Sequence, residues 1–165
     1  MKKIFALNLL LILFTTNSFS QTYDFSLSDV DGNTVTLKSL LEKGPVMVQF
    51  WALWCIPCKE EMKVNAELYE KYKDSGYVYA ALNQDSPKSS AKVKAYTESK
   101  NFKFPVLMDS DLKIFEQFGG QNLPFSVFIS KKGDIIKTYT GYISGDESKL
   151  EEDIKKAISD AKAGK

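Results

Sequence analysis

The chain of 165 residues contains no histidine and only two cysteines. All 22 of its basic side chains are lysines, so arginine is absent as well. Without histidine there is no Ser-His-Asp or Cys-His pair, no histidine general base and no histidine-containing metal site. Two cysteines cannot form a four-thiolate zinc site, and without arginine no bidentate clamp can hold a carboxylate or phosphate. We therefore expect no metal or cofactor, and catalytic groups drawn from cysteine, lysine, aspartate, glutamate, tyrosine or the backbone.

The remaining composition is typical of a globular protein. Hydrophobic residues make up 44% of the chain and charged residues 26%, which is far from a disordered profile. The formal net charge is only +1, and the lysines are spread along the chain rather than clustered among aromatic residues. The sequence therefore predicts no nucleic-acid partner.

The first twenty residues have the layout of a secretory signal. Met1-Lys2-Lys3 is a positively charged start, residues 4–14 are apolar, and residues 15–20 are small and polar apart from Phe19. The apolar run is shorter than the roughly 20 residues that span a membrane. We expect residues 1–20 to be a signal peptide and the protein to act in the periplasm or otherwise outside the cytoplasm; an uncleaved anchor is the alternative.

Residues 21–165 suit a single domain in which strands and helices alternate. Turn residues predict one β-hairpin across Asp31-Gly32 and another across Lys132-Gly133-Asp134. Apart from the first hairpin, strands are predicted over 46–51, 77–82, 104–108, 125–130 and 135–140, and helices over 59–73, 89–99, 109–118 and 146–162. The early alternation and the late hairpin predict an α/β fold, a mixed sheet with helices on both faces.

The two cysteines stand in the motif Trp54-Cys55-Ile56-Pro57-Cys58, between a predicted buried strand and the helix that follows it. The unpaired N–H groups at a helix N-terminus stabilise an anion, and in C-x-x-C motifs the thiol pKa can fall to between ~3.5 and ~7.5. We expect Cys55 to be the exposed nucleophile that attacks a disulfide, and the more covered Cys58 to resolve the mixed disulfide. Pro57 suits the first turn of the helix, where its missing N–H has no partner to lose.

Other uses of a cysteine pair fit this motif poorly. A bridge over so short a loop constrains little of the unfolded chain, and a zinc knuckle would lack its other ligands. A haem-attachment motif needs histidine at the next position, where the chain has Lys59. A pair of inert buried cysteines remains as the alternative.

The chain here resembles the thioredoxin superfamily, and more narrowly the TlpA/ResA-like thiol–disulfide oxidoreductases of the bacterial cell envelope. The resemblance extends from about Phe25 to the C-terminal helix. It is carried by Phe25-Ser26-Leu27, Asp31-Gly32, Val48-Gln49-Phe50-Trp51-Ala52-Leu53-Trp54-Cys55, Phe104-Pro105-Val106-Leu107 and Leu123-Pro124-Phe125. It implies a thioredoxin fold, here with an N-terminal β-hairpin extension.

The resemblance also implies a substrate-binding surface. In this family a proline at the position of Pro124 is cis and faces the dithiol, and the backbone at the position of Leu123 pairs with the substrate chain. We expect Trp54, Ile56 and Pro57 to contact the substrate as well. An ordinary trans proline that begins a strand is the alternative for Pro124.

Glu61 follows Cys58 by three residues, so the two share one face of the predicted helix. TlpA/ResA-like proteins carry a glutamate at this place, and a partly buried carboxylate could exchange protons with Cys58 and raise its pKa. The alternative is a solvated charge near the helix N-terminus. Cytosolic thioredoxins have a buried aspartate in the preceding strand where this chain has Gln49, which cannot titrate.

Two rival functions share this fold. A peroxiredoxin would have threonine or serine three residues before its reactive cysteine, together with an arginine, whereas this chain has Ala52 and no arginine. A Sco-type copper-binding protein would need a different cysteine spacing and a histidine. We expect a monomeric disulfide reductase that acts on disulfide-bearing exported proteins and receives electrons from a membrane thiol donor. The resemblance implies cytochrome c maturation as a setting.

Overall fold

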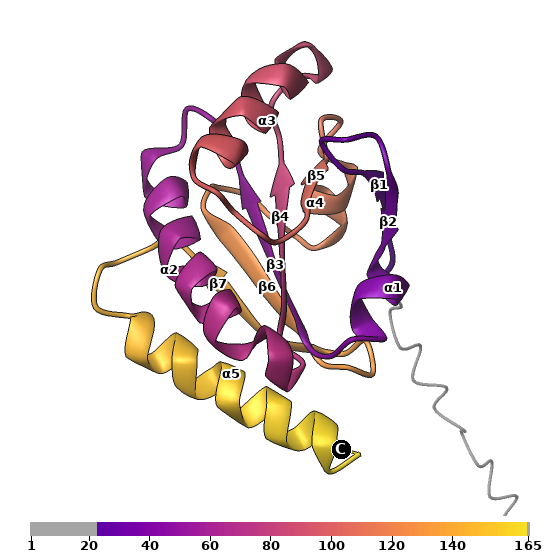
Figure 1. Cartoon of the computed structure of the whole chain (residues 1–165), viewed down its shortest axis with the longest axis vertical. Helices are drawn as coiled ribbons and strands as arrows, with labels where there is room; N and C mark the ends of the chain where they lie inside the picture. The colour runs from indigo at the N-terminus through magenta and orange to yellow at the C-terminus, as the bar shows by residue number, and fades with distance from the viewer. Residues whose placement is uncertain (1–22, 165) are drawn as a thin grey trace, which may run out of the picture.

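A five-stranded mixed sheet forms the centre of the computed structural model, which describes residues 23–164 (Figure 1). The predicted signal peptide lies outside the described residues. The strands lie in the order β5 (Val106–Met108), β4 (Val78–Asn83), β3 (Val46–Trp51), β6 (Phe125–Ile129) and β7 (Ile135–Thr140). β3, β4 and β5 are parallel, whereas β6 is antiparallel to both of its neighbours. The predicted mixed sheet is confirmed.

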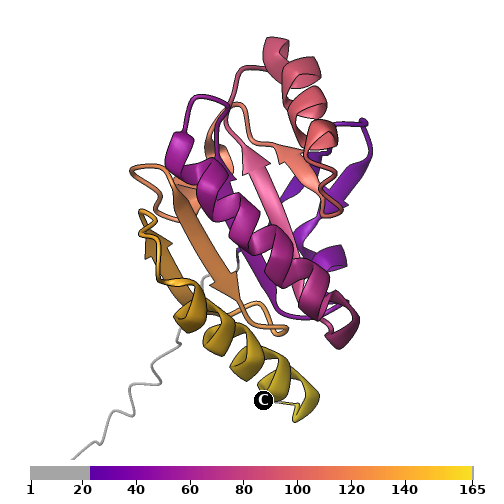
Figure 2. The ribbon, with the colours of Figure 1, turned by 60° about the vertical axis from the view of Figure 1, so that its left-hand side comes forward.

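Helices cover both faces of this sheet, as predicted (Figure 2). On one face lie α2 (Ile56–Tyr72), α3 (Ser90–Ser99) and α5 (Glu147–Lys162), and on the other α1 (Leu37–Leu41) and α4 (Lys113–Gln117). Two short 3-10 helices, η1 (Lys73–Ser75) and η2 (Pro87–Ser89), flank β4. Among the described residues, 23–164, no helix is long and apolar enough to cross a membrane.

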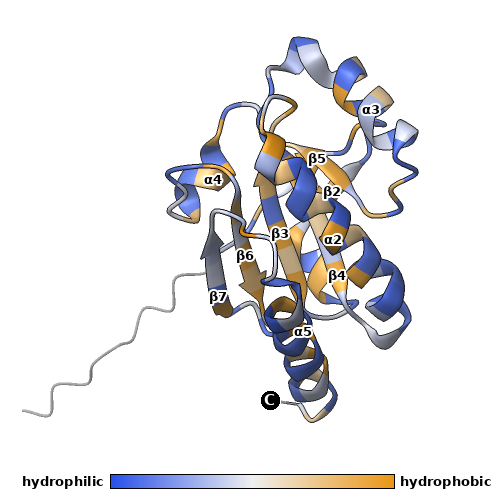
Figure 3. Ribbon diagram, turned by 90° about the vertical axis from the view of Figure 1, so that its left-hand side faces the viewer, coloured by the Kyte–Doolittle hydropathy of each residue, from blue (hydrophilic) through white to orange (hydrophobic). Residues whose placement is uncertain are grey.

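The alternation of side chains along β3 divides the buried residues into two cores. Met47 and Trp51 contribute to the core beneath α2, α3 and α5, whereas Val48 and Phe50 contribute to the core beneath α1 and α4. Figure 3 shows largely apolar strands in the sheet and mostly hydrophilic residues on α5. The same alternation places Gln49 on the α2 side, where it is fully buried.

The predicted N-terminal hairpin consists of β1 (Ser26–Ser28) and β2 (Thr34–Thr36) and forms a sheet of its own. A single bridge between Asp29 and Leu107 joins it to β5. The hairpin ends earlier than predicted, because Thr36 caps α1 by accepting the N–H of Ser39 at 3.1 Å. The sequence prediction missed this short helix.

The helix predicted over 109–118 is shorter than expected, since α4 begins only at Lys113. Leu112 lies in the left-handed region with φ of 61°, which separates it from the helix. The buried carboxylate of Asp109 accepts the N–H groups of Ile114 and Phe115 at 3.1 and 3.0 Å. Asp109 therefore accepts two N–H groups in the first turn of α4 that have no partner within the helix.

Candidate active site

The only two cysteines form a disulfide at the N-terminus of α2. The Cα atoms of Cys55 and Cys58 lie 5.3 Å apart. Cys55 is the N-cap residue, its Sγ accepts the N–H of Cys58 at 3.3 Å, and Pro57 occupies the first turn. The helix begins at Ile56 rather than at the predicted residue 59. The motif therefore supplies the cap and first turn of α2 as well as the two sulfurs.

Cys55 is more buried than the sequence predicted. Cys55 is 3% exposed and Cys58 is fully buried, so the expected order holds, but the expectation of an exposed Cys55 is wrong for this disulfide form. The reason is that the disulfide belongs to the core beneath α2, together with Trp51 and Met62. The exposed parts of the motif are instead its apolar side chains, Trp54 and Ile56.

Glu61, one turn after Cys58 on α2, is buried and held by two donors. Ser126 Oγ donates to Glu61 Oε1 at 2.7 Å, and Gln49 Nε2 donates to Glu61 Oε2 at 3.0 Å. Burial raises the pKa of Glu61 from 4.5 to about 7, although the Ser126 hydrogen bond acts in the opposite direction. The alternative of a solvated charge is therefore wrong, since this carboxylate is only 6% exposed and titrates close to neutral pH.

Gln49 connects this carboxylate to the cysteine motif. Its Nε2 donates to the carbonyl oxygen of Cys58 as well as to Glu61, both at 3.0 Å. Its Oε1 accepts a hydrogen bond from the hydroxyl of Tyr79. Burial raises the pKa of Tyr79 far above its usual range, so the hydroxyl stays protonated and can donate. All polar atoms of the Gln49 amide group thus point at named partners.

Sequence reasoning missed Ser126 as part of this site. In the sheet, Ser126 of β6 lies opposite Gln49 of β3, so both side chains point to the same face. The available signal was a polar residue in an otherwise apolar strand, two positions after Pro124. Recognising it would have required the pairing of β3 with β6, which connects residues far apart in the chain.

The peptide bond between Leu123 and Pro124 is cis, so the alternative of a trans proline is wrong. Phe125, the next residue, pairs with Phe50 near the end of β3 from which the motif emerges. Pro124 therefore lies at the end of the sheet where β3 leads into the cysteine motif. The carbonyl oxygen of Pro124 accepts the N–H of Gly141 at 2.9 Å, which places the loop after β7 at the same end of the sheet.

A small cavity of about 100 Å³ lies beside the buried carboxylate. Its walls include Glu61 and Val64 from α2, and Tyr139 and Tyr142 from β7 and the loop after it. The hydrogen bond to Glu147 raises the pKa of Tyr142 to about 12, and burial raises the pKa of Tyr139 as well. Both hydroxyls are therefore uncharged at neutral pH. The cavity brings Glu61 within reach of solvent from the side of α2 facing β7.

The part of the chain between residues 23 and 164 contains no group of three Cys, Asp or Glu side chains arranged to hold a metal ion. The reactive groups that the site does bring together are one disulfide and one buried carboxylate. Thiol–disulfide exchange is promoted by a helix end that stabilises the attacking thiolate and by a group that exchanges protons near neutral pH. The site contains both features.

The family model described as AhpC/TSA matches residues 20–139. The thiol-disulfide oxidoreductase ResA of Bacillus thuringiensis subsp. konkukian is 37% identical over 135 residues, which cover 81% of this chain and 74% of that protein. The chain belongs to the AhpC/TSA family and is a thiol–disulfide oxidoreductase of the ResA type. The ResA protein of Halalkalibacterium halodurans is 32% identical over 121 residues, 73% of this chain and 67% of its own length.

Solved structures agree with this ResA-type assignment. A protein from Chlorobium tepidum, described as a thiol:disulfide interchange protein DsbE, has a TM-score of 0.76 and 25% identity, with 83% of this chain and 95% of that chain covered. A protein from Neisseria meningitidis described as a thioredoxin has a TM-score of 0.74 and 32% identity, with 87% and 93% covered. The thioredoxin fold implied by the motifs is confirmed.

Proposed function

We propose that this oxidoreductase works as a disulfide reductase on exported proteins, with Cys55 as nucleophile and Cys58 as resolving thiol. The observation that carries the proposal is the disulfide at the N-terminus of α2, together with a buried carboxylate that shares the Gln49 amide with the carbonyl oxygen of Cys58. In the reduced protein the helix end would stabilise a thiolate at Cys55, which is the N-cap residue. Cys58, inside the first turn and fully buried, would act second.

The reaction proceeds in two exchange steps. The Cys55 thiolate attacks one sulfur of the client disulfide, a mixed disulfide forms, and the first client sulfur leaves as a thiolate that takes up a proton. Cys58 then loses its proton and attacks Cys55 Sγ, which forms the Cys55–Cys58 disulfide and releases the second client thiolate. The client gains two electrons and two protons, and the dithiol is oxidised.

Glu61 is the group that takes the proton from Cys58 in the second step. With its pKa near 7, the carboxylate is ionised and ready to accept a proton just above neutral pH. Gln49 donates to both the Cys58 carbonyl and the Glu61 carboxylate, so it holds the Glu61 side chain in a fixed position relative to Cys58. The proton then leaves toward the departing client thiolate or through the cavity beside Glu61.

The client binds across the apolar rim of the motif. Trp54 and Ile56 are 71% and 72% exposed, although both are large apolar side chains. Exposed apolar groups beside a reactive centre favour a docking role. The proposed contact surface also includes Pro57 of the motif and, from the loop before β6, Leu123 and Pro124. In this surface the Leu123 backbone pairs with the client chain.

The reductase would act outside the cytoplasm, as the layout of residues 1–20 suggests. An oxidising compartment already forms disulfides, so a dithiol kept reduced there serves reduction and needs a membrane thiol donor to supply electrons. Proteins that must present free thiols, such as apocytochromes c, are the client class we favour. The protein would act as a monomer.

Trapping clients tests this proposal. The Cys58→Ala variant should accumulate mixed disulfides on Cys55 with exported proteins, identifiable by mass spectrometry, whereas Cys55→Ala should trap none. The wild-type reduction potential should lie nearer thioredoxin's value of about −270 mV than the ~−120 mV of a strong oxidant. A potential near the second value would reverse the direction, and a Cys58→Ala variant that captures no client would refute the proposed nucleophile.

A further inference from the structure

The chain leaves the sheet just before the cysteine motif, and a side chain takes over its backbone pairing there. The N–H of Gln84 donates to the carbonyl of Trp51 at 2.9 Å, which extends the parallel pairing of β3 and β4 by one bond. Beyond it, the N–H of Leu53 donates to Asp85 Oδ2 at 2.7 Å. The carboxylate of Asp85, in the loop after β4, therefore accepts the Leu53 N–H in place of a backbone carbonyl from a neighbouring strand.

This carboxylate is itself held in position. Asn83 Nδ2 donates to Asp85 Oδ2 at 2.9 Å, and the N–H of Asp85 donates back to Asn83 Oδ1 at 3.0 Å. Ser110 Oγ donates to the Asp85 carbonyl at 2.7 Å, which ties the loop to the end of β5. Asn83 is fully buried at the C-terminal end of β4, so the network is anchored in the central sheet.

The bond from Leu53 acts on the turn that carries the proposed nucleophile. The N–H of Cys55 donates to the carbonyl of Ala52 at 3.0 Å, so residues 52–55 form a turn with Leu53 as its second residue. This turn places Cys55 Sγ 3.3 Å from the backbone nitrogen of Cys58. A bond between an N–H and an ionised carboxylate is stronger than one between neutral groups, so it suits this holding role.

We propose that Asp85 is a positioning residue for thiol–disulfide exchange, which fixes the turn before Cys55 and thereby holds Cys55 Sγ at the N-terminus of α2. The inference rests on the proposed function of Cys55 as nucleophile. With the turn held, a Cys55 thiolate keeps the Cys58 N–H and the helix end as stabilising partners. With the turn loosened, the thiolate loses part of that stabilisation and the thiol pKa rises.

Two substitutions separate the hydrogen bond from the charge of Asp85. Both Asp85→Asn and Asp85→Ala remove the charge, but only asparagine keeps an oxygen that can accept from Leu53. In the reduced protein, thiolate absorbance gives the Cys55 pKa, and reaction with a small aromatic disulfide gives its rate of attack. We expect Asp85→Ala to attack about tenfold more slowly than Asp85→Asn at a pH below the thiol pKa, with a higher Cys55 pKa.

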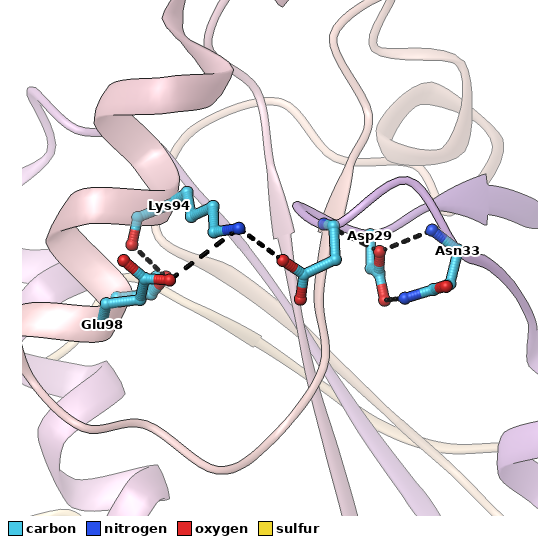
Figure 4. A network of polar contacts seen from close by, with 6 residues as sticks. Asp29, Asn33, Lys94 and Glu98 are labelled. Atoms are coloured by element: carbon cyan, nitrogen blue, oxygen red, sulfur yellow. Dashed lines mark hydrogen bonds and ion pairs between the residues drawn. The ribbon is translucent and has the colours of Figure 1, made fainter.

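Asp29 supplies a matched control. Its carboxylate accepts the backbone N–H groups of Asp31 and Asn33 at 2.9 and 2.8 Å and the Asn33 side-chain amide at 3.0 Å, as Figure 4 shows for Asn33. This turn belongs to the N-terminal hairpin, which borders β5 and not the motif. Asp29→Ala and Asp29→Asn should therefore differ in melting temperature but not in Cys55 pKa or rate of attack.

The proposal is overturned if Asp85→Ala and Asp85→Asn share the same Cys55 pKa and the same rate of attack. It is also overturned if the Asp29 pair differs as much as the Asp85 pair, because the effect would then be general destabilisation. Amide hydrogen exchange of wild-type Leu53 is a measurement that needs no variant: slow exchange supports the bond, and exchange at the unprotected rate contradicts it. Since all three readouts need no client, failure of the reductase proposal would show separately, as absent client trapping.

Discussion

Ser126 Oγ lies 2.7 Å from Glu61 Oε1, and 65 positions of chain separate the two residues. The second carboxylate oxygen accepts from Gln49 on the neighbouring strand. Burial favours the neutral acid and raises the pKa of Glu61 to about 7, whereas the hydrogen bond from Ser126 favours the ionised carboxylate and acts in the opposite direction. Burial is the larger effect, and the pKa of about 7 that results lets the Glu61 carboxyl exchange protons near neutral pH, which a solvated glutamate would not do.

Replacing Ser126 with alanine should raise the pKa of Glu61 above 7, because the hydrogen bond that lowers it is lost. The change is measured from the pH titration of the Glu61 carboxyl carbon by NMR in the oxidised protein. Ser130→Ala at the end of the same strand should leave the titration unchanged, since the Ser130 hydroxyl contacts only the β6–β7 turn. An unchanged Glu61 titration in Ser126→Ala would contradict the assigned hydrogen bond.

Glu61 should make the stability of the oxidised protein depend on pH. Its pKa is about 7 in the folded protein and 4.5 as a free side chain, so the stability contributed by its protonated form is full below pH 4.5 and is lost as pH rises through 7. At about 1.4 kcal/mol per pKa unit, the loss relative to Glu61→Gln is about 3 kcal/mol. Urea unfolding across this pH range measures it.

The neighbouring Glu60 is the control for this pH dependence. Its side chain pairs with Lys63 at the surface, so Glu60→Gln should keep the wild-type profile. If the free energies of unfolding of wild type and Glu61→Gln changed in parallel between about pH 4 and pH 8, the pKa of Glu61 would not be raised by folding.

Replacing Gln49 with leucine should destabilise the protein by about 1–3 kcal/mol, because Cys58 O and Glu61 Oε2 lose their buried donor. The loss should be larger above the Glu61 pKa than below it, since an ionised carboxylate needs the donor more. Met47→Leu on the same face of β3 is the matched control, a volume-conserving change at a buried position that should cost less at every pH. An equal loss for both variants would contradict the role given to Gln49.

Replacing Trp54 or Ile56 with serine should weaken reduction of protein disulfides without affecting stability. Because both side chains are mostly exposed, the melting temperature should not change. We expect KM for a protein disulfide to rise about tenfold, while the rate with a small disulfide stays the same. Ile136→Ser on β7, at 44% exposure, is the control and should change neither value. An unchanged KM in both motif variants would remove the apolar rim from the proposed docking surface.

Local pattern predicted the parts of the protein that depend on neighbours in the chain. The apolar run before the motif is β3, and the motif itself caps α2, since strand propensity and helix capping act over a few residues. The same reasoning failed at α4, where a left-handed Leu112 delays the helix and Asp109 caps it from a distance. It also missed α1, whose capping residue lies at the end of a strand.

By itself, the sequence determined the chemistry: two thiols at one helix end, one glutamate three residues further on, and no histidine or arginine to offer an alternative. The tertiary structure alone decided the environment of these groups. It buried both sulfurs, set Ser126 and Gln49 on the Glu61 carboxylate, and brought Asp85 to the turn before Cys55. The physical reason is that a pKa, a desolvation cost or a shared hydrogen bond depends on groups that meet in space, and strand pairing brings these together from distant parts of the chain.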